Sequence, residues 1–112
     1  MTAIELTAGE IPIIRIRGRL DIESAPRLEQ SLKTVLDTGK IRLVIDCSEM
    51  EYVSSPGIRV LLVAAKHIDS LAGRFALVSP RGYAKEILRT SGIPTVVPMP
   101  DTESEALRFC QT

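Results

Sequence analysis

Residues 42–62, with the sequence RLVIDCSEMEYVSSPGIRVLL, place an apolar strand signal directly before a helix signal. Leu43 and Ile45 alternate with their neighbours, as expected for a strand with one apolar side. Pro56 is favoured in the first turn of a helix, and the apolar run behind it predicts a helix to about Leu71. A strand that leads straight into a helix is typical of an α/β fold.

The rest of the chain also alternates between strand and helix signals. A hairpin is expected over residues 3–20, with its turn at Ala8-Gly9-Glu10, and a helix from about Ser24 to Gly39. Beyond the helix at Pro56, the pattern predicts a strand over 74–80, a short helix over 81–92, a strand over 95–99 and a last helix over 101–110. Such alternation implies a largely parallel sheet with crossover helices.

Charged residues inside the strands indicate how the helices are arranged. Strands covered on both sides should be apolar throughout, but Arg15, Arg17 and Arg42 interrupt two of them. The sequence therefore predicts an α/β fold with a mixed β-sheet and its helices packed on one face. A doubly wound sheet is the alternative. The residues expected in the core are Leu43, Ile45, Leu61, Leu62 and Leu77.

Length and composition narrow the classes of function. The 112 residues predict one domain over 1–112, and 14 basic residues balance 14 acidic ones. A neutral chain argues against nucleic-acid or anionic-membrane binding. We expect no membrane insertion, because no apolar run approaches about 20 residues. We expect a cytoplasmic protein, with no visible secretory signal and with Cys47 and Cys110 as reduced thiols.

The serines beside the proline have a structural and a functional interpretation. Ser55 stands before Pro56, which predicts Ser55 as the N-cap and Pro56 and Gly57 as the first helical residues. A helix N-terminus also favours a phosphate, because its free N–H groups and its dipole attract negative charge. Ser55 and Ser54 are thus candidate phosphorylation sites.

The helix behind the serines is apolar beyond its core stripe. Leu61 and Ile68 belong to the expected core face, but Val60 and Val63 lie off it. Arg59 should be exposed, because Ile58 and Leu61 take the core side. A helix that is apolar around its circumference is either deeply buried or faces a partner. In a sheet covered on one side, this pattern favours a protein-binding face.

No pattern indicates catalysis. The single histidine, His67, has no nucleophile motif to serve, and no metal-binding spacing is present. We therefore expect no enzyme activity, no cofactor and no metal. A small hydrolase is the weakest of the functions considered.

Three stretches in order resemble the STAS domain, and in particular the small bacterial anti-sigma factor antagonists. They are IRGRLDIESAPRLEQSL, RLVIDCSEMEYVSSPGIRVLL, and GRFALVSP followed by ILRTSGI. The resemblance covers essentially the whole chain. It implies a mixed sheet with helices on one side and a role in binding a serine kinase that is also an anti-sigma factor.

The resemblance also implies a switch and a partner surface. In the family, unphosphorylated antagonist holds the kinase, and phosphorylation of the serine before a glycine at the head of the second helix releases it. Here that position is Pro56, which makes phosphoregulation doubtful or moves it to Ser55. The partner-binding residues carried over or inferred are Asp21, Ser24, Ser55, Pro56, Gly57, Arg59, Val60 and Val63.

An alternative function within the same fold is a non-switching STAS subunit of an ABC-type lipid transport complex. Such a subunit would also lack the acceptor serine. The sequence leaves the partner and the upstream signal open, and it leaves a homodimer open as well.

Overall fold

The computed structural model describes residues 2–112, which form a four-stranded sheet and its helices. The strands lie in the order β1-β2-β3-β4; β1 is antiparallel to β2, and the other neighbours are parallel. The elements are β1 (Ala3–Thr7), β2 (Ile13–Leu20), α1 (Ala25–Asp37), β3 (Arg42–Val53), α2 (Ser55–Ser70), β4 (Arg74–Val78), α3 (Gly82–Thr90), a 3₁₀ turn (Ile93–Thr95) and α4 (Glu103–Cys110). The α/β class and the mixed sheet predicted from the sequence are confirmed.

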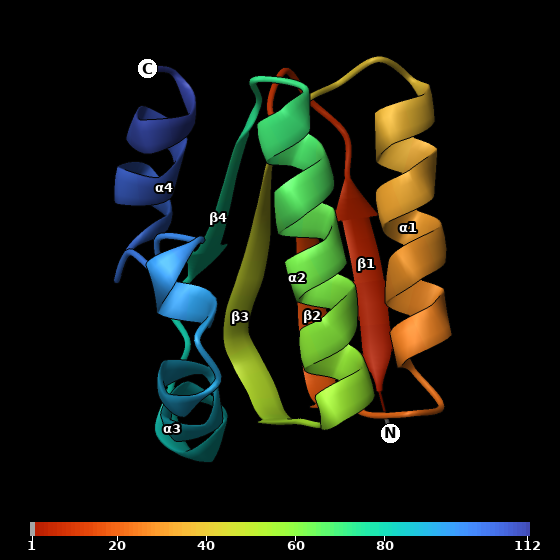
Figure 1. Cartoon of the computed structure of the whole chain (residues 1–112), viewed down its shortest axis with the longest axis vertical. Coiled ribbons are helices and arrows are strands. Elements are labelled where there is room, and N and C mark those ends of the chain that lie inside the picture. Colours follow the sequence, from red (N-terminus) through yellow and green to blue (C-terminus); the bar gives the residue numbers. More distant parts are fainter. Residues whose placement is uncertain (1) are drawn as a thin grey trace.

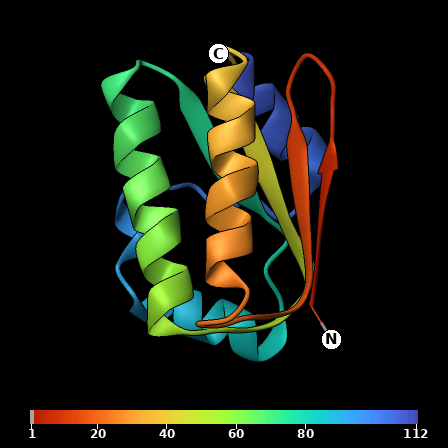
Figure 2. The same ribbon diagram turned by 90° about the vertical axis from the view of Figure 1, so that its right-hand side faces the viewer.

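One face of the sheet carries the main core. Helices α1 and α2 lie side by side over this face (Figures 1 and 2), and α3 adds Ala84 and Leu88 at the end where β3 finishes. Four of the five predicted core residues, Leu43, Ile45, Leu61 and Leu77, have no exposed surface. Leu62 is half-buried and packs against the edge of this core.

Helix α4 is the exception to the expectation that the helices share one face. Its residues Ala106 and Cys110 pack on Val44, Ala76 and Val78, which point away from the main core. These strand residues alternate with main-core residues, because successive side chains of a strand point to opposite faces. The second face is thus covered at β3 and β4 and open over β1 and β2.

The strand expected over 95–99 is not formed among the described residues. The chain turns through the 3₁₀ segment and then runs along the free edge of β4. There the N–H groups of Leu77 and Ser79 donate to the carbonyl oxygens of Pro98 and Pro100, at 3.1 and 2.9 Å. Both acceptor residues are prolines, which have no N–H to return, so only half of a strand ladder can form.

Candidate functional site

Two turns far apart in the sequence meet at the head of α2. The Ser54 N–H donates to the Leu20 carbonyl oxygen at 2.8 Å, which joins the turn after β2 to the turn after β3. A Cβ atom on Gly57 would lie 2.9 Å from that same carbonyl and 2.8 Å from Leu20 Cγ. Only glycine therefore allows α2 to sit this close to the end of β2.

Ser54, and not Ser55, is the N-cap of α2. Ser54 has an extended backbone, and its hydroxyl oxygen accepts a hydrogen bond from the Gly57 N–H at 3.3 Å. The Ile58 N–H donates to the Ser54 carbonyl at 2.9 Å. Ser55 is the first helical residue and is exposed, and Pro56 is the second. The predicted cap was wrong by one residue, because proline is tolerated anywhere in the first turn, where N–H groups have no helical acceptor.

The turn after β2 is held by Asp21 and Ser24. Asp21 Oδ1 accepts from the Glu23 and Ser24 N–H groups, both at 3.1 Å, and the Ser24 hydroxyl donates to the Arg19 carbonyl at 2.7 Å. Hydrogen bonds from Ser24 lower the pKa of the Asp21 carboxyl, so it stays ionised. Ser24 is 2% exposed, so it shapes this turn and offers no side-chain contact to a partner.

The remaining predicted partner-binding residues form a second patch along α2. Arg59 is exposed, as the sequence indicated, and Val63 is 57% exposed. Val60 is half-buried and, with Val63 and His67, lines an apolar groove of about 340 Å³ between α1 and α2. The structure thus brings Asp21, Ser55, Pro56 and Gly57 together and places Arg59, Val60 and Val63 on the helix that leads away from them.

One cluster beside the site was missed in the sequence. The Arg19 guanidinium lies 4.2 Å from the centre of the Tyr52 ring, and Tyr52 stacks on Tyr83 of α3 at 6.1 Å. Tyr83 is 68% exposed. Arg19 and Tyr52 are partners in the β2–β3 register, but two irregularities in that register precede them. Counting along the strands could not predict the pairing for this reason.

The arrangement contains no pair suited to nucleophilic catalysis. Ser55 and His67 are twelve residues apart on α2, about 18 Å along the helix axis. Burial raises the pKa of the Cys47 thiol to about 12, which leaves it protonated at neutral pH. Within residues 2–112, no three His, Cys, Asp or Glu side chains gather where they could hold a metal ion. Over the same residues, no helix is long and apolar enough to cross a membrane.

Comparisons with known proteins agree with this fold. The sequence profile described as "STAS domain" matches residues 5–106. BtrV of Bordetella bronchiseptica, provisionally named an anti-sigma factor antagonist, is 29% identical over 97 residues, which cover 87% of this chain and 84% of that protein.

Solved structures point to the same group. A provisionally named anti-sigma factor antagonist of Thermotoga maritima superposes with a TM-score of 0.89 at 25% identity, covering 97% of this chain and 95% of that one. An anti-sigma factor antagonist of Mycobacterium paratuberculosis gives 0.84 at 26% identity, covering 100% and 94%. The unphosphorylated form of SpoIIAA shares the fold, with a TM-score of 0.72 at 21% identity over 96% of each chain.

Proposed function

The chain belongs to the STAS domain family, and from this premise we propose that it is an anti-sigma factor antagonist, a cytoplasmic protein-binding module that holds a serine kinase acting as anti-sigma factor. The observation that carries the proposal is the joined surface at the head of α2. The bond from Ser54 to Leu20 and the close approach at Gly57 hold the Asp21 turn and the exposed Ser55 on one rigid surface. The names of the relatives support the same role.

The proposed partner surface runs from the Asp21 turn across Ser55 and Pro56 to Arg59 and Val63. It combines an ionised carboxylate, an exposed guanidinium and an exposed valine. Charged groups at the edge of an interface contribute mainly to the choice of partner. The apolar groove beside Val63 provides apolar surface that a bound partner would bury. Ser24 and Gly57 contribute through the shape of the surface.

We further propose that this antagonist binds without release by phosphorylation. Pro56 occupies the family's acceptor position and has no hydroxyl group. Ser54 uses its hydroxyl oxygen to cap α2. Ser55 has an exposed side chain, but it lies one residue away, about 3.5 Å along the chain, from the position where the kinase acts. An offset of this size disfavours in-line phosphoryl transfer.

Affinity capture from the native cell tests the partner class. We expect a kinase of the anti-sigma type, and recovery of transporter subunits would instead support the lipid-transport alternative. With the captured partner, calorimetry should show Arg59→Glu binding weaker by roughly 1–3 kcal/mol. The matched control is Arg108→Glu, an exposed arginine on α4 that should leave the affinity unchanged. Equal affinities for both variants, with the fold intact, would exclude this surface.

Incubation with the captured kinase and ATP, followed by intact-mass measurement, tests the missing switch. Wild type should be phosphorylated slowly if at all. Pro56→Ser, which restores a hydroxyl group at the acceptor position, should gain one phosphate faster. Ser55→Ala and Ser54→Ala identify the residue if wild type is modified. Rapid uptake by wild type that is abolished in Ser55→Ala would show a working switch moved by one residue.

A further inference from the structure

Two arginines face each other at the start of β4, at the end of the sheet opposite the head of α2 (Figure 1). Arg42 of β3 and Arg74 of β4 are partners in the strand register. Their side chains share the face that carries α4, on neighbouring strands about 4.8 Å apart. Like charges placed directly opposite one another destabilise a sheet.

Within the described part of the chain, no carboxylate forms an ion pair with either arginine. Arg15, Arg17 and Arg19, on the same face of β2, lie 2.8 to 3.8 Å from a carboxylate oxygen, whereas Arg42 and Arg74 take part in no ion pair among residues 2–112. Arg74 also has a buried Nε with no hydrogen-bond acceptor. Buried donors are nearly always satisfied, so this one indicates a missing acceptor.

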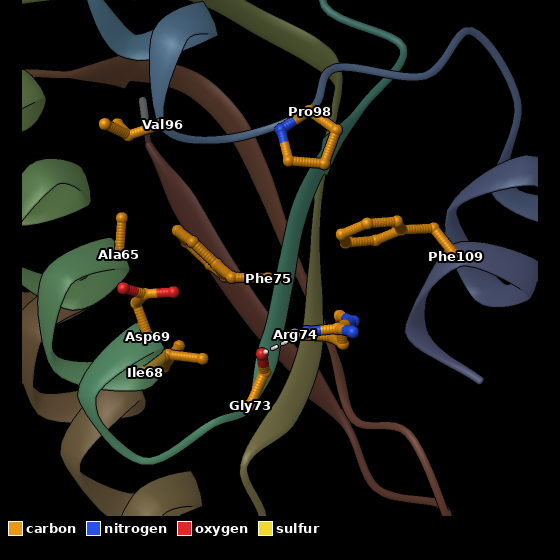
Figure 3. A pocket seen from close by; sticks show the side chains of 9 residues that line it. All are labelled: Ala65, Ile68, Asp69, Gly73, Arg74, Phe75, Val96, Pro98 and Phe109. Carbon is orange, nitrogen blue, oxygen red and sulfur yellow. Dashed lines mark hydrogen bonds between the residues drawn. The ribbon is translucent and has the colours of Figure 1, made fainter. Parts of the chain in front are cut away.

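The surroundings of Arg74 leave room for that acceptor. Its guanidinium lies 5.7 Å from the centre of the Phe109 ring, and Nη1 donates to the Gly73 carbonyl at 3.3 Å. Beside it is a small cavity of about 90 Å³, lined also by Phe75 and Pro98 (Figure 3). One water needs roughly 10–15 Å³ by this measure, so a small ion fits.

We propose that Arg74, with the added positive charge of Arg42 on the neighbouring strand, forms a binding site for a small oxyanion, such as inorganic phosphate or the carboxylate of a small organic acid. A planar guanidinium fork matches the oxygens of either group. One anion in the cavity beside Arg74 would supply an acceptor for Nε, and its charge would offset the repulsion between Arg74 and Arg42 across the strands.

Two neighbouring features limit the size and charge of the ligand. The carboxylate of Asp69 lines the same cavity, on the other side of β4 from the Arg74 side chain (Figure 3), and it disfavours larger polyanions. The C-terminal turn of α4 ends close by and lends partial negative charge. That charge offsets part of the repulsion between the arginines but provides no acceptor to Nε.

Nuclear magnetic resonance on ¹⁵N-labelled protein tests the site directly. Phosphate is titrated in the low-millimolar range with sodium chloride adjusted to constant ionic strength, and acetate is titrated in a parallel series. We expect saturable shifts of the Arg74 Nε–H signal and of the Phe109 and Cys110 amides. The anion that saturates the shifts at the lower concentration identifies the class of oxyanion that the site prefers.

Three variants decide the outcome. Arg74→Gln should weaken anion binding by about tenfold or more, because it removes the guanidinium that lines the cavity. Arg42→Gln should weaken it by roughly threefold, because it removes a neighbouring positive charge. Arg17→Gln, an arginine on the same face that already has carboxylate partners, should leave the affinity within about twofold. Shifts that stay linear with concentration for both anions, or that persist unchanged in Arg42→Gln, would overturn the proposal. Neither result bears on the partner surface at the opposite end of the sheet.

Discussion

The two faces of the sheet are stabilised in different ways. The main face is covered by α1, α2 and α3, and its side chains at Leu43, Ile45 and Leu77 are fully buried. The other face is apolar only under α4. Over β2 and the adjoining part of β3 it carries ion pairs instead, with Arg15 Nε 2.9 Å from Asp46 Oδ2 and Arg17 Nε 2.8 Å from Glu49 Oε2.

The difference shows what a strand sequence must provide on each side. Burial on the main face supplies free energy in proportion to apolar area, so every alternate position is apolar. The open face keeps water beside it, where exposed ion pairs contribute little. Charges there fix register and solubility more than stability, except at Asp46, which is 7% exposed.

The largest expected effect is on the main face. Leu61→Ala should lower the free energy of unfolding by about 2–5 kcal/mol, because Leu61 has no exposed surface and its loss leaves a cavity under α2. Val63→Ala is the matched control on the same helix; Val63 is 57% exposed and should change stability by about 0.5 kcal/mol or less. Urea denaturation measures both, and similar values would mean that α2 is rotated relative to the core.

The next effect concerns the one buried charge on the open face. Burial favours a raised pKa for Asp46, but hydrogen bonds from Ser48 and the contact with Arg15 outweigh it and lower the pKa overall. Asp46→Asn should lower the free energy of unfolding by about 1–3 kcal/mol at pH 7, because it weakens the charge-assisted hydrogen bonds from Arg15 and Ser48.

The pH dependence of this loss has a defined sign. A carboxyl whose pKa is lowered by folding stabilises the protein above its unfolded value of about 4 and loses that contribution as the pH falls through the folded value. The difference in free energy of unfolding between wild type and Asp46→Asn should therefore shrink as the pH falls into the acid range. The control is Asp37→Asn, an exposed partner of Lys33. A difference between wild type and Asp46→Asn that stays constant from pH 7 to pH 2 would contradict the assignment.

The smallest expected effect lies among the exposed pairs. Arg17 contacts Glu5 and Glu49 at 3.1 and 2.8 Å, but all three side chains are about half exposed. Arg17→Gln should change the free energy of unfolding by about 1 kcal/mol or less, and high salt should reduce the difference further. A loss as large as that of Leu61→Ala would break the contrast between the two faces.

The sequence predicted most of the main face because its signals are local. The opening hairpin, the strand at Leu43 and Ile45, and the helix after Pro56 each follow from periodicity and turn residues. The cap of α2 was missed by one position, since Ser54 and Ser55 are equally good capping residues. Periodicity also assigned residues 95–99 to a strand, where Pro98 prevents a full ladder.

Features that depend on contacts between distant segments could not be predicted in the same way. The placement of α4 on the second face depends on how Cys110 meets Val44 and Ala76, more than thirty residues earlier. The stack of Arg19 on Tyr52 depends on irregularities in the β2–β3 register. At the candidate site, the exposed Arg59 was predicted from the helix face, but the burial of Ser24 became visible only in the folded turn.

The edge of β4 has a consequence for how the protein behaves at high concentration. An unpaired strand edge is a template on which a second molecule can add its own strand, and fibrous aggregates grow by repeating that step. Here the outer edge of β4 is already occupied by the carbonyls of Pro98 and Pro100. Pro98 and Pro100 have no N–H group, so at these two positions the covering segment cannot donate a backbone hydrogen bond to a further strand. Strand addition therefore stops at this side of the molecule, and sheet polymerisation through β4 is blocked by two imino acids.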